Sequence, residues 1–202
     1  MVISLIQLTA LLLDFYLPKT EKNDSVSENY IDEMKNSFKY LISNKMVLAI
    51  LFSSLIVSMV AMPVRLQLPI IARRLYMISP SEIGLLLTLA GIGAVFGTLM
   101  ISTLKKGNLR FLLFLISAFG LGFCILTLSI FPYYSVGLIV VIFFGAFEQI
   151  RMALSNVLTM EYTDKKYRAR MMGFFMLNFA FIPFGALPIG YGVDKLLSLI
   201  HI

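Results

Sequence analysis

Two residues of opposite charge, Glu148 and Arg151, stand three positions apart within an apolar stretch, 134–158. On an α-helix this spacing places both side chains on one face. If the stretch crosses a membrane, two charges at that depth are costly unless they pair, reach the headgroups or line a wet cavity. The functional hypothesis is that this face lines a central cavity, where Glu148 takes up and releases a coupling proton and Arg151 tunes its proton affinity or holds an anionic group. In the alternative, Arg151 extends to the inner headgroups and Glu148 pairs with it or with another helix.

Five long apolar stretches have the length of membrane-spanning helices, because about 20 apolar residues are needed to cross the ~30 Å hydrocarbon layer. The composition agrees. Hydrophobic residues make up 59% of the chain and charged residues 14%, whereas about a quarter of the residues in soluble domains are charged. The sequence therefore predicts an all-α, polytopic transmembrane helical bundle of about five full spans, preceded by the end of a sixth helix. The predicted spans are 46–72, 81–101, 110–131, 134–158 and 171–193.

The chain divides into three predicted parts. Residues 1–17 lack a basic leader and a small-residue cleavage site, so they are interpreted as the end of a transmembrane helix and not as a signal peptide. Residues 18–45 are predicted to form a cytoplasmic linker that is irregular over 19–29. An amphipathic helix over 31–44 then lies along the inner membrane surface, or, in the alternative, packs on a soluble partner domain. Residues 46–202 form the transmembrane bundle.

Basic residues are distributed unevenly between the two sides of the predicted membrane. With 18–45 inside, twelve Lys and Arg fall in inner segments and four fall outside, which is the positive-inside bias of membrane proteins. The inner residues are Lys19, Lys22, Lys35, Lys39, Lys45, Lys105, Lys106, Arg110, Lys165, Lys166, Arg168 and Arg170, and the outer ones are Arg65, Arg73, Arg74 and Lys195. The net charge of +6 therefore indicates contact with the anionic lipid of a bilayer and not with nucleic acid.

Few residues could support enzymatic or metal chemistry. The single cysteine, Cys124, lies within an apolar stretch, and the single histidine, His201, lies at the end of the chain. No His, Asp or Glu cluster has metal-ligand spacing, and there is no glycine-rich phosphate loop. The sequence therefore predicts a protein that is not an enzyme, uses no cofactor or metal, and does not power transport by its own ATP hydrolysis.

Glycine and proline punctuate the second and fifth stretches. A capping box from Ser79 to Glu82, with Pro80 at the first helical position, predicts that the second span begins near Pro80. The second stretch carries Gly91, Gly93 and Gly97, and the fifth carries Pro183, Gly185 and Pro188. The glycines predict close helix packing, with substrate contact as the alternative. The prolines predict an interrupted helix, and such helices can be moving parts of transporters. In the alternative, the prolines only kink the helix so that it packs against its neighbours.

Several sequence runs stand in an order and spacing shared with one group of transporters. They are 37–47 (SFKYLISNKMV), 68–73 (LPIIAR), 81–97 (SEIGLLLTLAGIGAVFG), 167–173 (YRARMMG) and 184–190 (FGALPIG). Together they resemble the second half of the major facilitator superfamily fold, in its drug and siderophore (enterobactin-exporter-like) branch. On this resemblance the chain is the C-terminal half of a twelve-helix transporter. Its first residues would end the sixth helix, and the last helix would be missing.

The resemblance implies secondary active transport, namely proton-coupled export of a small lipophilic or amphipathic molecule across a bacterial inner (cell) membrane. The small-molecule substrate and the missing N-terminal half of the transporter are the implied partners. A non-transporting integral membrane subunit that scaffolds a complex is the alternative from another functional class.

Two arginines are candidates for a cytoplasmic gate. Arg168 and Arg170 match the R-G-R pattern that the family has between its tenth and eleventh helices, although Ala169 replaces the glycine. The segment 104–110 also lacks the aspartate of the family's cytoplasmic signature. Binding of anionic headgroups is the alternative role of these arginines.

Overall fold

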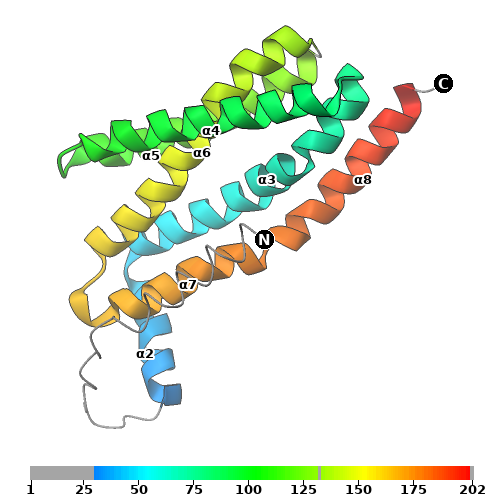
Figure 1. The fold of residues 1–202 in the computed structure, drawn as a ribbon. Coiled ribbons are helices and arrows are strands. Elements are labelled where there is room, and N and C mark those ends of the chain that lie inside the picture. The colour runs from blue at the N-terminus through cyan, green and yellow to red at the C-terminus, as the bar shows by residue number, and fades with distance from the viewer. Residues whose placement is uncertain (1–29, 132, 201–202) are drawn as a thin grey trace, which may run out of the picture. The chain divides into compact units, whose positions relative to one another are not determined.

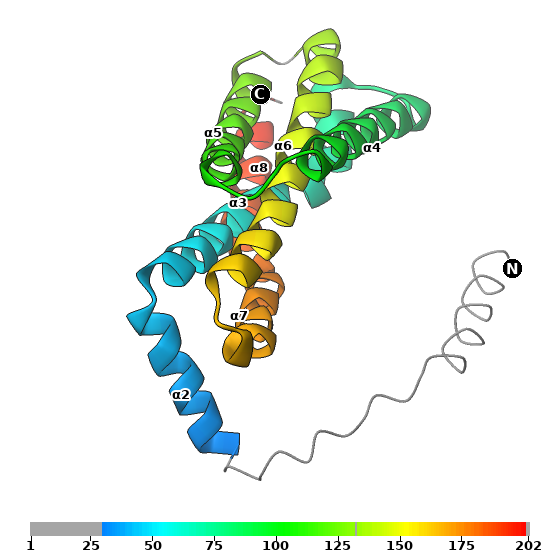
Figure 2. The same cartoon turned by 90° about the vertical axis from the view of Figure 1, so that its left-hand side faces the viewer.

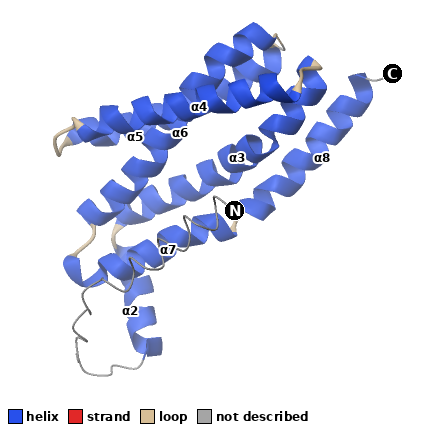
Figure 3. Cartoon of the chain, viewed as in Figure 1, coloured by secondary structure: helices blue, strands red, loops and turns tan. Residues whose placement is uncertain are grey.

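The structure, a computed structural model, describes residues 30–131 and 133–200. Its regular elements over these residues are all helical (Figure 3). They are α2 (Tyr30–Ser43), α3 (Lys45–Tyr76), α4 (Pro80–Ser102), α5 (Asn108–Ile130), α6 (Tyr134–Tyr162), the short 3-10 helix η1 (Lys165–Tyr167), α7 (Arg168–Ala180) and α8 (Ile182–Ile200). The predicted helix end at 1–17 and the irregular segment at 19–29 lie outside the described residues. The helix predicted over 31–44 is present as α2.

The chain divides into two units, Met1–Met34 and Lys35–Ile202, and the second unit holds the helical bundle. The described residues contain five spans that are long and apolar enough to cross a membrane. They are Lys45–Arg73, Pro80–Ser102, Asn108–Ile130, Tyr134–Tyr162 and Lys165–Gly192. Many large apolar side chains point outward, as a surface in contact with lipid tails requires. The predicted all-α, polytopic membrane bundle is therefore confirmed.

Helix α4 begins where its capping residues predict. The backbone N–H of Ser79 donates to Oε2 of Glu82 at 2.8 Å, and the Ser79 hydroxyl donates to the same oxygen at 2.7 Å. Pro80 occupies the first helical position, where no N–H is needed. These contacts fix the start of the second span.

Helix α6 lies at the centre of the bundle. It packs against α3, α4, α5 and α7, and Figure 2 shows it between α4 and α5 with α3 behind it. Glycines on α4 allow the closest approach. A Cβ at Gly93 would collide with the backbone of Ile142, and a Cβ at Gly97 would come within 2.7 Å of the Ala146 carbonyl oxygen. The two glycines therefore lie in helix contact, whereas nothing lies within 4 Å of a Cβ at Gly91.

The predicted span 171–193 is divided into α7 and α8 by a turn at Phe181. Pro183 explains the division, because proline has no N–H to donate to the carbonyl of Phe179 and its ring clashes with the preceding turn. Proline near the start of the next helix is well tolerated. Pro188 lies inside α8 without ending it.

Helix α8 lies beside α3 (Figure 1). Gly185 marks their closest contact, since a Cβ there would overlap the backbone carbonyl of Met59. The small residue thus serves packing between the first and last described spans.

The helix connections gather at two ends of the bundle. At one end, Nδ2 of Asn44 donates to the carbonyl of Tyr162 at 3.2 Å and joins the start of α3 to the end of α6. At the other end, the rings of Tyr76 and Tyr134 pack edge to face with centroids 6.1 Å apart. These are called the α2 end and the Tyr76 end below.

Candidate functional site

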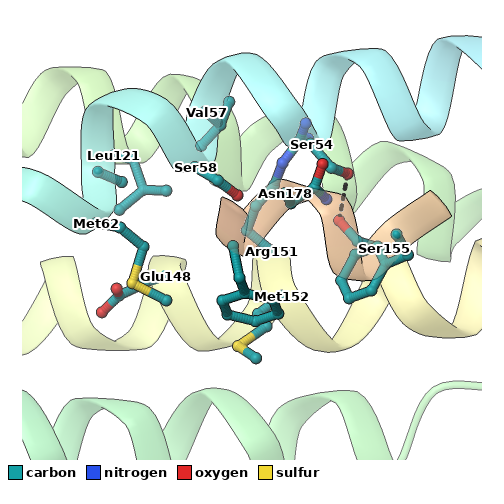
Figure 4. Close-up of a pocket in the computed structure, with 13 residues that line it drawn as sticks. Ser54, Val57, Ser58, Met62, Leu121, Glu148, Arg151, Met152, Ser155 and Asn178 are labelled. Carbon is teal, nitrogen blue, oxygen red and sulfur yellow. Dashed lines mark hydrogen bonds between the residues drawn. The ribbon is translucent and has the colours of Figure 1, made fainter. Parts of the chain in front are cut away.

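Charged side chains in the middle of α6 face a small cavity inside the bundle. Glu148 and Arg151 both line it from α6 (Figure 4). Ser54 and Ser58 of α3 and Asn178 of α7 add to its polar lining. The cavity measures about 40 Å³. That volume holds water or a small polar group, and it is far below the size of a pocket for a drug-sized ligand.

Glu148 pairs with Arg65 of α3 and not with Arg151. Its Oε2 accepts a hydrogen bond from Nη1 of Arg65 at 3.0 Å. The Glu148 side chain is 11% exposed and the Arg65 side chain is 56% exposed. The ion pair therefore joins a nearly buried carboxylate to a guanidinium at the surface of α3.

Arg65, one of the basic residues predicted on the outer side, lies within the predicted span 46–72. Arg65 lies inside α3, which continues through Pro63 and Pro69 to Tyr76. Membrane helices commonly tolerate internal prolines, because neighbouring helices or local backbone adjustments can compensate for the lost hydrogen bonds. The ion pair places a third charge at the depth of Glu148.

Arg151 is held by two other helices. Its Nη1 donates to the carbonyl oxygen of Phe114 on α5 at 2.8 Å, and its Nη2 donates to Oγ of Ser53 on α3 at 2.8 Å. The guanidinium carbon also lies 3.5 Å from the centroid of the Phe114 ring, in the range of a cation–π interaction. The residue is only 5% exposed. Arg151 is thus buried between the helices of the bundle.

A pair of serines joins α3 to α6 beside Arg151. The hydroxyls of Ser54 and Ser155 lie 2.7 Å apart (Figure 4). Ser54 also donates to the carbonyl of Ile50 at 2.7 Å, so Ser155 is the donor in the serine pair. Both serines are buried. Polar side chains, Ser53 and Ser54 of α3 and Arg151 and Ser155 of α6, therefore line the contact between these two helices.

Three buried polar atoms that belong to cavity-lining residues have no hydrogen-bond partner among the described residues. They are Oε1 of Glu148, Nε of Arg151 and Nδ2 of Asn178. Leaving such an atom unpaired costs about 1–3 kcal/mol. The cavity residues therefore offer two donors and one acceptor to a polar occupant.

The two arginines predicted as a gate lie at the start of α7, at the α2 end, away from the cavity. Nε of Arg168 donates to the carbonyl of Thr163 at 3.2 Å. Nη1 of Arg170 donates to Oγ of Ser37 on α2 at 3.3 Å. The structure thus gives the two arginines different partners, and neither lines the cavity of Glu148 and Arg151.

A wider depression of about 400 Å³ opens beside Arg168 at the α2 end. Its charged lining residues are Lys106, Arg110, Glu161 and Arg168. Arg110 pairs with Glu161 at 3.3 Å and donates to the Leu104 carbonyl at 2.7 Å. Three cations thus face one carboxylate in this depression.

Tyrosines join α2 to the connection after α6. The rings of Tyr40 and Tyr167 stack with centroids 4.2 Å apart. The Tyr40 hydroxyl accepts from the backbone N–H of Asp164 at 3.0 Å and from Nδ2 of Asn44 at 3.3 Å. This arrangement, called the tyrosine clasp below, holds the 163–167 connection against α2.

Sequence reasoning missed two contributors to the central site, Arg65 and Asn178. Arg65 and Gln67 are polar residues between two prolines in a long apolar segment, and that pattern could have indicated a polar helix face. Asn178 is the one amide within the predicted span 171–193. Among the described residues, no group of three or more His, Cys, Asp and Glu could hold a metal ion.

Five apolar spans, with a small charged cavity between some of their helices, define a polytopic integral membrane protein. The family model of the transmembrane secretion effectors matches residues 2–191. The match spans most of the chain, so the protein belongs to this family of major facilitator superfamily (MFS) membrane proteins. No curated protein and no solved structure matches the chain.

Proposed function

We propose that the protein is a secondary transporter that exports a small lipophilic or amphipathic molecule. Membership of the secretion effector family supports membrane transport as the general function. The cavity between α3, α6 and α7 supports it further, because charged groups at membrane depth are costly and commonly mark the passage of ions or substrates.

The finer assignment is to the drug and siderophore exporter branch, with the chain acting as one half of a larger helical transporter. The order of the sequence runs quoted above supports this branch. Arg65 supports a larger assembly, since a half-exposed guanidinium in the middle of a span is poorly placed against lipid tails. A further helical half, or a water-filled passage between two halves, would solvate it.

The central part of the proposal is that Glu148 binds and releases the coupling proton. One carboxylate oxygen bonds Arg65, and the other has no partner among the described residues. Protonation would neutralise Glu148 and weaken the ion pair that joins α6 to α3. The two protonation states would then favour different arrangements of these helices, which is what coupling requires.

At the α2 end, Arg168 and Arg170 are proposed to act in a cytoplasmic gate. Each holds the start of α7 to a neighbouring segment. The excess of Lys and Arg near this end supports placing residues 18–45 in the cytoplasm of a bacterial cell, with the bundle in its inner membrane.

Transport in proteoliposomes tests the coupling role. The full-length protein is reconstituted with an imposed pH gradient, and efflux of a lipophilic dye is followed together with proton flux. Glu148→Gln is expected to reduce proton-driven transport by at least about 100-fold, as expected for loss of an essential proton-transfer group. Dye binding and membrane insertion should persist.

Glu161→Gln provides a matched control, because it makes the same change near the end of the same helix. It should keep the wild-type ratio of protons to substrate. Wild-type coupling in Glu148→Gln would place the coupling group elsewhere. No dye movement by the folded wild-type protein would favour a non-transporting subunit instead.

A further inference from the structure

The charges in the middle of the described spans do not balance. Arg65, Glu148 and Arg151 are the charged residues of the described spans that lie far from the span ends. Arginine stays protonated in proteins. The two guanidiniums and one carboxylate therefore leave a net charge of +1 when Glu148 is ionised, and more when it is protonated.

The neighbours of these residues do not supply the missing negative charge. Arg151 binds a backbone carbonyl and a serine hydroxyl, which are both neutral. Glu148 is the sole acidic residue among the described residues that line the cavity, and the remaining polar ones are serines and Asn178. The positive charge of Arg65 and Arg151 is thus only partly neutralised by the residues around them.

Arg65 is the guanidinium that a ligand can reach. Its side chain is 56% exposed, while Arg151 is 5% exposed. The described residues give Arg65 one hydrogen-bond acceptor, Oε2 of Glu148, although a guanidinium carries five N–H donors. Several donors therefore remain for an external acceptor with the bidentate geometry of a carboxylate or similar anion.

The cavity that Glu148 and Arg151 line is small, and Arg65 lies outside it. At about 40 Å³ it admits a small polar group and not the body of an amphipathic molecule. A ligand would place its head at the site and its apolar part along the outside of α3, where Leu66 and Ile70 are exposed.

We infer that the transported molecule is a lipophilic anion whose acidic group binds Arg65 in exchange for the Glu148 carboxylate. This inference rests on the proposed transport function and names the substrate class of the same site. The Arg65 guanidinium would then donate alternately to the protein's own carboxylate and to the ligand's.

Binding of a matched pair of probes tests this inference. The probes are 1-pyrenebutyric acid and its primary amide, which differ in the charge of one group, and binding to the full-length protein in nanodiscs is followed by fluorescence anisotropy. The wild-type protein should bind the acid about tenfold more tightly than the amide, the effect of one charge-assisted hydrogen bond. Arg65→Gln should remove this preference and leave amide binding unchanged, which also reports that the variant is folded.

Two further variants sharpen the result. Arg73→Gln removes an exposed arginine near the end of the same helix and should keep the acid preference, which excludes a general attraction of the anion to basic protein. Glu148→Gln should strengthen acid binding several-fold without changing amide binding, because it frees Arg65 from its competing carboxylate.

Equal affinity of the wild-type protein for both probes would overturn the inference, as would an acid preference that survives Arg65→Gln. Either result would leave proton-driven efflux of an uncharged dye intact, so the transport proposal would stand. Conversely, an acid preference in a protein whose Glu148→Gln variant retains coupling would refute the coupling role alone.

Discussion

Phe114 contacts Arg151 through both its ring and its backbone carbonyl. Its ring centroid lies 3.5 Å from the guanidinium carbon, and its carbonyl oxygen accepts a hydrogen bond from Nη1 at 2.8 Å. Both contacts use the flat guanidinium, which can donate in its plane and stack with its face. The central charge of α6 is thus anchored on α5, while its neighbour Glu148 is anchored on α3.

Replacement of Arg151 should reveal whether the protein needs the charge or the shape of this group. Arg151→Lys keeps a buried charge but cannot keep both hydrogen bonds and the stacked plane, so we expect a loss of about 2 kcal/mol. Arg151→Met removes the charge and should cost less, because no ion is left under-solvated. Thermal unfolding can be followed by reaction of the buried Cys124 with a fluorogenic thiol reagent. Lower stability of the Met variant than of the Lys variant would contradict this account.

Two glycines on one helix should respond oppositely to alanine. At Gly91 a Cβ meets nothing within 4 Å, so Gly91→Ala should stabilise the helix slightly, by up to about 1 kcal/mol. At Gly93 a Cβ collides with the Ile142 backbone, and Gly93→Ala should cost about 1–3 kcal/mol through overpacking. The same thiol-based unfolding assay measures both. Equal effects at the two positions would mean that α4 and α6 are not packed through Gly93.

The tyrosine clasp should protect the connection after α6 from proteases. Tyr40→Phe removes the hydroxyl that accepts from Asp164 and keeps the stacked ring, whereas Tyr40→Ala removes both. Trypsin cleavage after Lys165 and Lys166 should therefore accelerate modestly in the first variant and strongly in the second, since local opening becomes easier. Unchanged cleavage in Tyr40→Ala would show that the clasp does not hold the connection.

The proposed orientation predicts which side of the membrane each end of the bundle faces. Single cysteines replace Lys106 at the α2 end and Tyr133 at the Tyr76 end in a Cys124→Ser background; both native residues are exposed. An impermeant maleimide added to intact cells should label position 133 and leave position 106 unlabelled until the membrane is permeabilised. The reverse pattern would invert the assignment of residues 18–45 to the cytoplasm.

The membrane bundle could be predicted from the sequence because each span is recognised from one continuous segment, without knowledge of its neighbours. A span needs only enough consecutive apolar residues, and the capping box at Ser79 and Glu82 marked the start of α4. The division of the fifth span was harder to place. Several glycines and prolines occur there, and one of them, Pro183, stops the helix while Pro188 does not.

The central site could be predicted only in part, because partners on other helices are not encoded by spacing. Glu148 and Arg151 were recognised as a pair on one face, and both line the cavity. Their actual partners, Arg65 and Phe114, lie on α3 and α5. Helix rotation and depth decide such contacts, and neither is readable from a single apolar stretch.

The contact of Gly185 with Met59 has a consequence for the order of assembly. The ribosome completes α3 before α4 to α7 and makes α8 after them, so the surface around Met59 enters the membrane without its final neighbour. Lipid chains must cover that backbone groove in the meantime, although they cannot follow it as closely as a glycine-bearing helix does. Docking of α8 is therefore a late step of biogenesis, in which lipid is exchanged for protein along the first span.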